Sequence, residues 1–143
     1  LLTENLVDLP DPIRGTSLEL SGILTKVKKL YDEGVPVETL CNSLQEYVFG
    51  SLAEIANRSL SAHPEDRNLV LVGGVACNER LQSMIEGVAS FHGVQKYTCP
   101  KRLLVDNGAM IAWSGLQNLH RNKISLKDST VMQKMEYGFT EKD

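Results

Sequence analysis

A double glycine followed by an asparagine is the first feature of the sequence whose residue types suit chemistry. The run over 68–72 is apolar and rich in branched residues, and Gly73, Gly74 and Asn78 come after it. Glycine lets the backbone approach a ligand because it has no Cβ. The N–H groups at a helix start can face a phosphate or a carboxylate. Asn78 near that start could cap the helix or hydrogen-bond a base or ribose.

The same residues also have a purely structural interpretation. A strand that turns tightly into a helix needs glycine, and an asparagine at the first helical turn is a preferred cap. On pattern alone the structural interpretation is favoured, because a double glycine is weaker evidence than a complete phosphate-loop motif.

A lone carboxylate is the second candidate. Asp106 precedes the apolar spacing of the last clear helix, where it could cap the first turn. The same location would also leave one oxygen free for a metal ion shared with distant ligands. Capping is favoured for a single aspartate, and one carboxylate alone makes no closed metal site. The three histidines and three cysteines add none, since their spacing matches neither zinc sites nor nucleophile motifs.

Apolar spacing predicts the helices that position these residues, and two short runs predict strands. In chain order, the expected elements are a helix from Ser17 to about Tyr31, a helix over 37–60, a strand over 68–72, a helix through Leu81 to Ala89, a strand over 94–99 and a helix that opens near Asp106. Ser17 is expected to cap the first helix.

The order of these elements predicts an α/β fold. The two strands are joined through a helix, which favours a parallel pair with a right-handed crossover. Two parallel strands rarely form a stable sheet alone, because they need neighbours and cover. The sequence therefore indicates the second part of a domain whose other strands lie elsewhere. We expect an N-terminal loop over 1–16, a subdomain over 17–122 and a polar tail over 123–143.

Composition excludes several classes of protein. The 143 residues are 42% hydrophobic and 23% charged, which is typical of globular chains and not of disordered ones. The 15 Lys and Arg against 18 Asp and Glu give a net charge of −3, so any RNA contact must be local or shared with a partner. No run is long and apolar enough to span a membrane. Scattered cysteines indicate reduced thiols and an intracellular location. The chain starts on Leu, which suits a piece of a longer protein.

Taken together, the motifs resemble one known family. VGGVACNERLQ over 72–82 and DNGAMIAW over 106–113 are similar to the paired C-terminal motifs of the family that synthesises threonylcarbamoyladenosine in tRNA. Its members are the bacterial TsaD proteins, the catalytic KEOPS subunit and the mitochondrial Qri-type proteins. LCNSLQEYVF over 40–49 also matches the family, and GTSLELSGIL over 15–24 is a divergent form of its SFSG segment. The similarity runs from about residue 15 to about residue 131.

The resemblance implies the C-terminal part of an actin/Hsp70/sugar-kinase-like (ASKHA) nucleotide-binding fold, incomplete on its own. It implies transfer of threonylcarbamoyl from threonylcarbamoyl-adenylate to the N6 amine of the adenine next to the anticodon in ANN-reading tRNAs. Carried over by residue, Gly73 and Gly74 would line the phosphate side of the nucleotide. Asn78 would contact the adenylate, and Asp106 would be one metal ligand. No catalytic residue is assigned.

The resemblance also implies cofactors and partners. The expected cofactor is one divalent metal ion, iron or zinc, whose remaining ligands lie outside this chain, and the nucleotide ligand is threonylcarbamoyl-adenylate or ATP. Expected partners are tRNA and KEOPS-type subunits, namely a small atypical kinase and a small dimerising subunit, or a second copy in the mitochondrial branch. The location would be cytoplasmic and nuclear, or mitochondrial in that branch. The family's HxxxH metal pair is absent from this sequence, so the chain alone is expected to be inactive.

Two other functions stay open. One is a non-catalytic assembly module of a KEOPS-like complex. The other is a metal-dependent glycoprotein endopeptidase, the older label of the family, although the sequence has no HExxH-like helix to support it.

Overall fold

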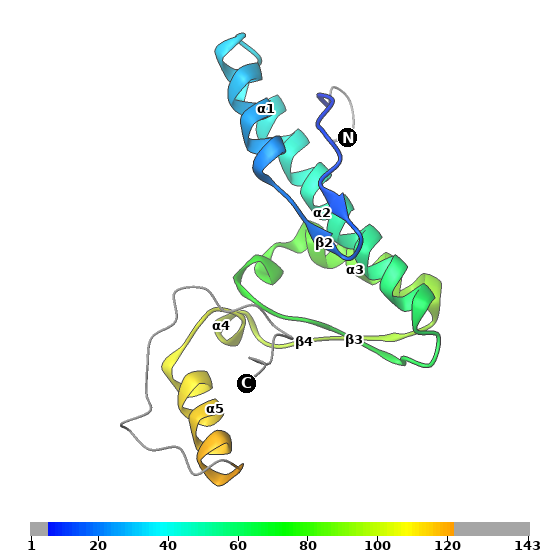
Figure 1. Cartoon of the computed structure of the whole chain (residues 1–143), viewed down its shortest axis with the longest axis vertical. Helices are drawn as coiled ribbons and strands as arrows, with labels where there is room; N and C mark the ends of the chain where they lie inside the picture. Colours follow the sequence, from blue (N-terminus) through cyan, green and yellow to red (C-terminus); the bar gives the residue numbers. More distant parts are fainter. Residues whose placement is uncertain (1–5, 122–143) are drawn as a thin grey trace, which may run out of the picture. The chain divides into compact units, whose positions relative to one another are not determined.

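The computed structural model describes residues 6–121, which fall into two units divided after Val105 (Figure 1). In chain order the elements are β1 (Ile13–Arg14), β2 (Ser17–Leu18), α1 (Ser21–Asp32), α2 (Val37–Ala62), β3 (Asn68–Leu71), the 3-10 turn η1 (Gly74–Cys77), α3 (Glu79–His92), β4 (Gln95–Thr98), α4 (Lys101–Leu104) and α5 (Gly108–Arg121). The predicted α/β class is confirmed. The polar tail predicted over 123–143 lies outside the described residues, and so do residues 1–5 of the predicted N-terminal loop.

A tight hairpin occupies the expected start of the first helix. β1 and β2 pair antiparallel, with Arg14 opposite Ser17. Gly15 begins the turn between them with a φ of +64°, which glycine adopts without steric cost. The prediction that Ser17 caps the helix is therefore wrong. Ser17 lies in β2, and α1 begins at Ser21 without a side-chain cap.

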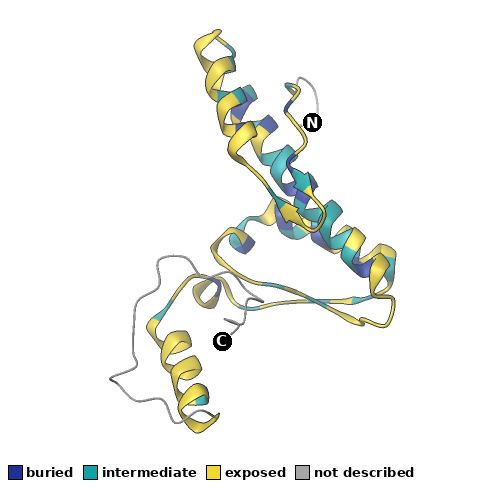
Figure 2. Ribbon diagram, viewed as in Figure 1, coloured by how far each residue is buried: buried dark blue, intermediate teal, exposed yellow. Residues whose placement is uncertain are grey.

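The long helix α2 is the element against which α1 and α3 pack. Its predicted span of 37–60 is confirmed, with two further residues at the end. Ile23 of α1 and Leu40 of α2 are buried, and Figure 2 shows buried positions along the long helix α2. The fully buried Ser43 donates its hydroxyl to the Thr39 carbonyl at 2.7 Å and accepts the Val7 N–H at 2.9 Å. The hydroxyl thus satisfies its hydrogen-bonding capacity and fixes the segment before β1 on α2.

The second sheet carries the turn with the double glycine. β3 and β4 pair parallel, from Asn68 opposite Gln95 to Leu71 opposite Thr98, which confirms the predicted parallel pair. Helix α3 connects the two strands. Among residues 6–121 this sheet has two strands only.

The core of the first unit lies between this sheet and the helices α2 and α3. Phe49 of α2 packs with Leu81 and Ile85 of α3, and Leu69 and Leu71 of β3 pack against this cluster. The alternate residues of the strands, Val70 and Tyr97, are 61% and 52% exposed. One face of the sheet is therefore covered within the described residues, and the other carries exposed apolar side chains.

The sequence after β4 forms two helices. Helix α4 was not predicted, and Pro100 is the residue that flanks its start. The helix expected near Asp106 is confirmed as α5, which begins at Gly108. Its large apolar residues, Met110 to Leu119, are all at least 43% exposed. Over residues 6–121, none of the helices has the length and hydropathy that a membrane span requires.

We predict that Phe49→Ala lowers the free energy of unfolding of the chain by about 3–5 kcal/mol, because it removes a buried ring and leaves a cavity. Phe91→Ala is the matched control, since Phe49 is 8% exposed and Phe91 is 82% exposed. Urea unfolding followed by circular dichroism measures both values. Equal losses for the two variants would contradict the described core.

Candidate functional site

The turn between β3 and α3 brings three of the predicted site residues together. Gly73 has a φ of +96° and a ψ of 163°, a conformation that L side chains rarely adopt. A Cβ built on Gly73 meets no atom within 4 Å, so backbone conformation and not crowding requires glycine there. A Cβ on Gly74 would lie 3.8 Å from the Val105 side chain. Both glycines are exposed, which leaves their backbone open to a ligand.

Asn78 is the cap of α3. Its Oδ1 accepts the N–H of Arg80 at 2.9 Å and that of Leu81 at 3.4 Å. Its Nδ2 donates to Oε1 of Gln45 in α2 at 3.2 Å. The structural interpretation of Asn78 is therefore confirmed, while its contact with an adenylate stays a prediction.

An ion pair lies beside this cap. Arg80 donates from Nε to Oε1 of Glu46 at 2.8 Å and from Nη2 to Oε2 at 2.7 Å. Such bidentate hydrogen bonds between charged groups are stronger than hydrogen bonds between neutral groups. The Glu46 side chain is only 9% exposed. The hydrogen bond from Arg80 holds the pKa of the Glu46 carboxyl below its ordinary value, although burial opposes this shift. The same hydrogen bond raises the pKa of Arg80.

Gln45 and Glu46 have roles that no sequence pattern predicts. Both residues lie within the segment 40–49, which was singled out only as part of the resemblance. Their partners are 33 and 34 residues further along the chain. In the sequence, Gln45 and Glu46 are two adjacent polar residues within an amphipathic helix, and this pattern does not predict which residues they contact.

Asp106 is the first residue of the second unit. The expectation that it caps the last helix is wrong, because the Oδ1 of Asn107 accepts the Met110 N–H at 3.0 Å. Helix α5 begins at Gly108, so Asn107 and not Asp106 is in the capping position. Asp106 is exposed and lies one residue before the capping position.

The arrangement of side chains that can bind metals shows whether residues 6–121 could hold a metal ion by themselves. Among residues 6–121, no group of three or more His, Cys, Asp or Glu side chains is arranged to hold one. The carboxylate of Asp106 has the oxygen donors that divalent ions accept, so it fits one position of a metal site whose other ligands come from elsewhere.

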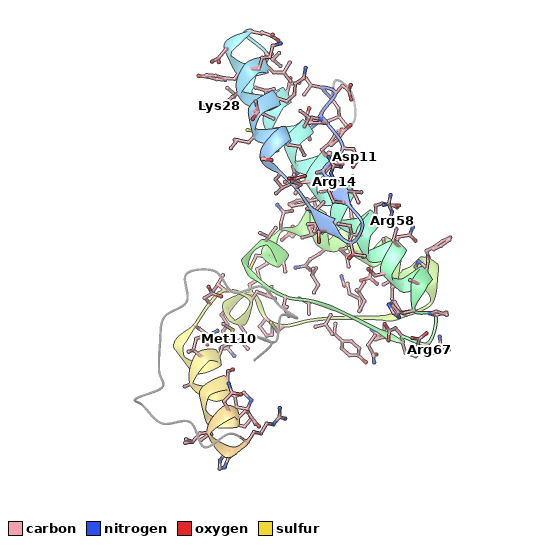
Figure 3. The ribbon with its side chains drawn as sticks, viewed as in Figure 1. Asp11, Arg14, Lys28, Arg58, Arg67 and Met110 are labelled. Atoms are coloured by element: carbon pink, nitrogen blue, oxygen red, sulfur yellow. The ribbon has the colours of Figure 1, made fainter. Side chains whose placement is uncertain are left out.

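The cationic side chains labelled in Figure 3 come from separate elements. Figure 3 shows Arg14, Lys28, Arg58 and Arg67 on the hairpin, on α1, on α2 and before β3. Two of them are already paired, Arg14 with Glu19 and Arg58 with Glu54. These four residues therefore form no common basic surface, in line with the net charge of −3.

Comparison with known proteins identifies relatives. The sequence model of the family TsaD, described as tRNA N6-adenosine threonylcarbamoyltransferase, matches residues 1–113. The chain is 45% identical over 119 residues to a probable bifunctional tRNA threonylcarbamoyladenosine biosynthesis protein of Methanocaldococcus jannaschii, which covers 83% of this chain and 22% of the relative.

Two further relatives are each named tRNA N6-adenosine threonylcarbamoyltransferase. The one from Methanopyrus kandleri is 39% identical over 128 residues, or 90% of this chain and 36% of the relative. The one from Nanoarchaeum equitans is 44% identical over 113 residues, or 78% of this chain and 35% of the relative. The chain thus spans between about a fifth and about a third of the length of these curated relatives.

We predict that Arg80→Met destabilises the chain strongly near pH 7 and less in acid. A lowered folded pKa means that Glu46 stabilises the fold above its ordinary pKa of 4.5 and loses this effect as the pH falls through the lowered value. Urea unfolding between pH 3 and pH 7 measures the difference from the unmodified chain.

Arg58→Met is the control for this prediction. It removes an exposed pair within α2, with side chains 49% and 42% exposed, and we expect a smaller effect at pH 7. A difference between the Arg80→Met chain and the unmodified chain that stays constant from pH 3 to pH 7 would contradict the role of Glu46.

Proposed function

The chain belongs to the TsaD family, described as tRNA N6-adenosine threonylcarbamoyltransferase, and from this premise we propose that it forms the C-terminal part of such an enzyme. The observation that carries the proposal is the family match over residues 1–113, which includes both the Gly73–Asn78 turn and Asp106. Two relatives with 39% and 44% identity carry the name of this transferase.

The open sheet supports the proposal that the chain is one part of a larger ASKHA fold. Within the described residues, β3 and β4 have no further strand beside them, and Val70 and Tyr97 are exposed on the uncovered face. Parallel sheets are usually covered on both faces and extended by neighbours. The rest of the enzyme would supply that cover, together with the other metal ligands.

The proposed reaction is an acyl transfer. The N6 amine of the adenine attacks the carbamoyl carbon of threonylcarbamoyl-adenylate and forms the new C–N bond. The bond from that carbon to the phosphate oxygen breaks, AMP leaves with its electron pair, and the amine releases its proton to solvent. The exposed backbone of Gly73 and Gly74 would lie along the phosphate, and Asn78 would donate a hydrogen bond to the adenylate. A divalent ion, iron or zinc, held in part by Asp106 would polarise the transferred carbonyl group.

The partners follow from the same proposal. The substrate tRNA would be held mainly by basic surface outside this chain, since the chain has a net charge of −3. The protein partners would be KEOPS-type subunits, a small atypical kinase and a small dimerising subunit, or a second copy of the enzyme in the mitochondrial branch. The enzyme would be cytoplasmic and nuclear, or mitochondrial in that branch.

A non-catalytic assembly module is the second candidate. An apolar groove between α1 and α2 favours it, with Leu20, Ile23, Leu24, Val27, Leu44 and Val48 lining the groove. Leu24 is 66% exposed, as expected of a surface that another protein segment covers. The two candidates differ in whether Asp106 is needed.

We predict that Asp106→Ala in the full-length protein lowers threonylcarbamoyladenosine in total tRNA at least about 100-fold, because it removes a metal ligand. Mass spectrometry of tRNA nucleosides measures the loss, and elemental analysis of the purified protein measures the metal. Asp66→Ala is the control, since it removes an exposed carboxylate from a loop. Unchanged nucleoside levels with a stably folded Asp106→Ala protein would favour the assembly module.

A second prediction separates the two roles of Asn78. Asn78→Asp keeps the oxygen that caps α3 but removes the N–H donors. Its free energy of unfolding should therefore stay within about 0.5 kcal/mol of that of the unmodified protein, while its affinity for ATP should fall. Asn78→Ala loses both roles and should also lose about 1 kcal/mol of stability. Calorimetric titration with ATP and urea unfolding measure the two effects. ATP affinity that is unchanged in both variants would refute the proposed contact.

A further inference from the structure

The hydrogen bonds of Asn78 limit what its side chain can offer a ligand. An asparagine amide has two N–H donors and one oxygen with two lone pairs. Oδ1 accepts from two backbone N–H groups, that of Arg80 at 2.9 Å and that of Leu81 at 3.4 Å. Because backbone N–H groups only donate, the oxygen must face the helix, and Nδ2 must lie on the other side of the amide. Nδ2 gives one hydrogen to Oε1 of Gln45, so one N–H donor is left.

We propose that Gln45 is a positioning residue for nucleotide binding. By accepting one hydrogen of Asn78 Nδ2, it fixes the plane of the amide and thereby the direction of the remaining N–H. That N–H suits an acceptor atom of an adenine nucleotide, such as a ribose oxygen, a ring nitrogen or a phosphate oxygen. The inference rests on the proposed function, which supplies the contact between Asn78 and the adenylate.

Gln45 is itself held in place by its surroundings. It is half-buried in the middle of α2, and the next residue, Glu46, makes two hydrogen bonds to Arg80. Two consecutive residues of one helix therefore hold residues 78 and 80 on either side of the start of α3. Since α2 also packs on α3 through Phe49, the Gln45 side chain meets Asn78 from a fixed backbone.

The test measures ATP binding by the full-length protein. Gln45→Leu removes the acceptor with little change in size, and we expect ATP to bind about five- to tenfold more weakly. Gln45→Glu keeps an oxygen that accepts the same N–H, and it should restore most of the affinity. Gln95→Leu is the matched control, because the exposed Gln95 amide donates to the carbonyl of its neighbour Lys96 and is remote in sequence from Asn78.

A double-mutant cycle separates positioning from general damage. If Gln45 acts through Asn78, then Gln45→Leu added to Asn78→Ala weakens ATP binding no further. In steady-state assays, Gln45→Leu should raise the KM for threonylcarbamoyl-adenylate about five- to tenfold and leave kcat within about twofold. General damage to the site would lower kcat as well.

The two hypotheses fail in different ways. Normal ATP affinity of Gln45→Leu, together with weak binding by Asn78→Ala, would overturn the positioning role and leave the Asn78 contact intact. Additive losses in the cycle would also overturn it. Normal affinity of Asn78→Ala would instead overturn the contact on which the positioning role rests.

Discussion

The packing of α3 against α2 is the contact on which the rest of the first unit depends. Its apolar part joins Phe49 to Leu81 and Ile85, and the inward side chains of β3 rest on the same cluster. Because α3 is also the connection between β3 and β4, this contact sets where the parallel pair lies. The turn with Gly73 and Gly74 begins at the end of β3, so its position follows from the same packing.

The polar end of that contact has a different physical role. Apolar burial is non-directional, so it brings the helices together without fixing the angle of any side chain. The Glu46–Arg80 pair and the Gln45–Asn78 bond do fix angles, because each has a required geometry. A mostly buried carboxylate without its partner would be costly, so Glu46 also ties the start of α3 to one arrangement.

Local patterns predicted the elements that extend over many residues. The spacing over 37–60 predicted α2, and the apolar run followed by glycines predicted β3, its turn and α3. The hairpin was missed because two-residue strands are too short to show alternation. The start of the following helix was misplaced because Ser17 is an acceptable capping residue by type, whereas it lies in β2 and α1 begins at Ser21. The pairing of Gln45 with Asn78 spans 33 residues, and no local pattern contains it.

The two candidate side chains show why capping and ligand binding are not alternatives. The sequence offered each interpretation for both Asn78 and Asp106. Asn78 is a cap, yet an amide is bifunctional, so the cap uses its oxygen and leaves an N–H for a ligand. An ionised carboxylate has two acceptor oxygens and no donor, so a capping Asp106 would share its charge between backbone N–H groups and a metal ion. Asp106 stays suited to a metal because the neighbouring Asn107 caps α5 in its place. In the sequence Asp106-Asn107-Gly108, the amide of Asn107 caps α5, and the carboxylate of Asp106 stays available to the metal ion that we propose.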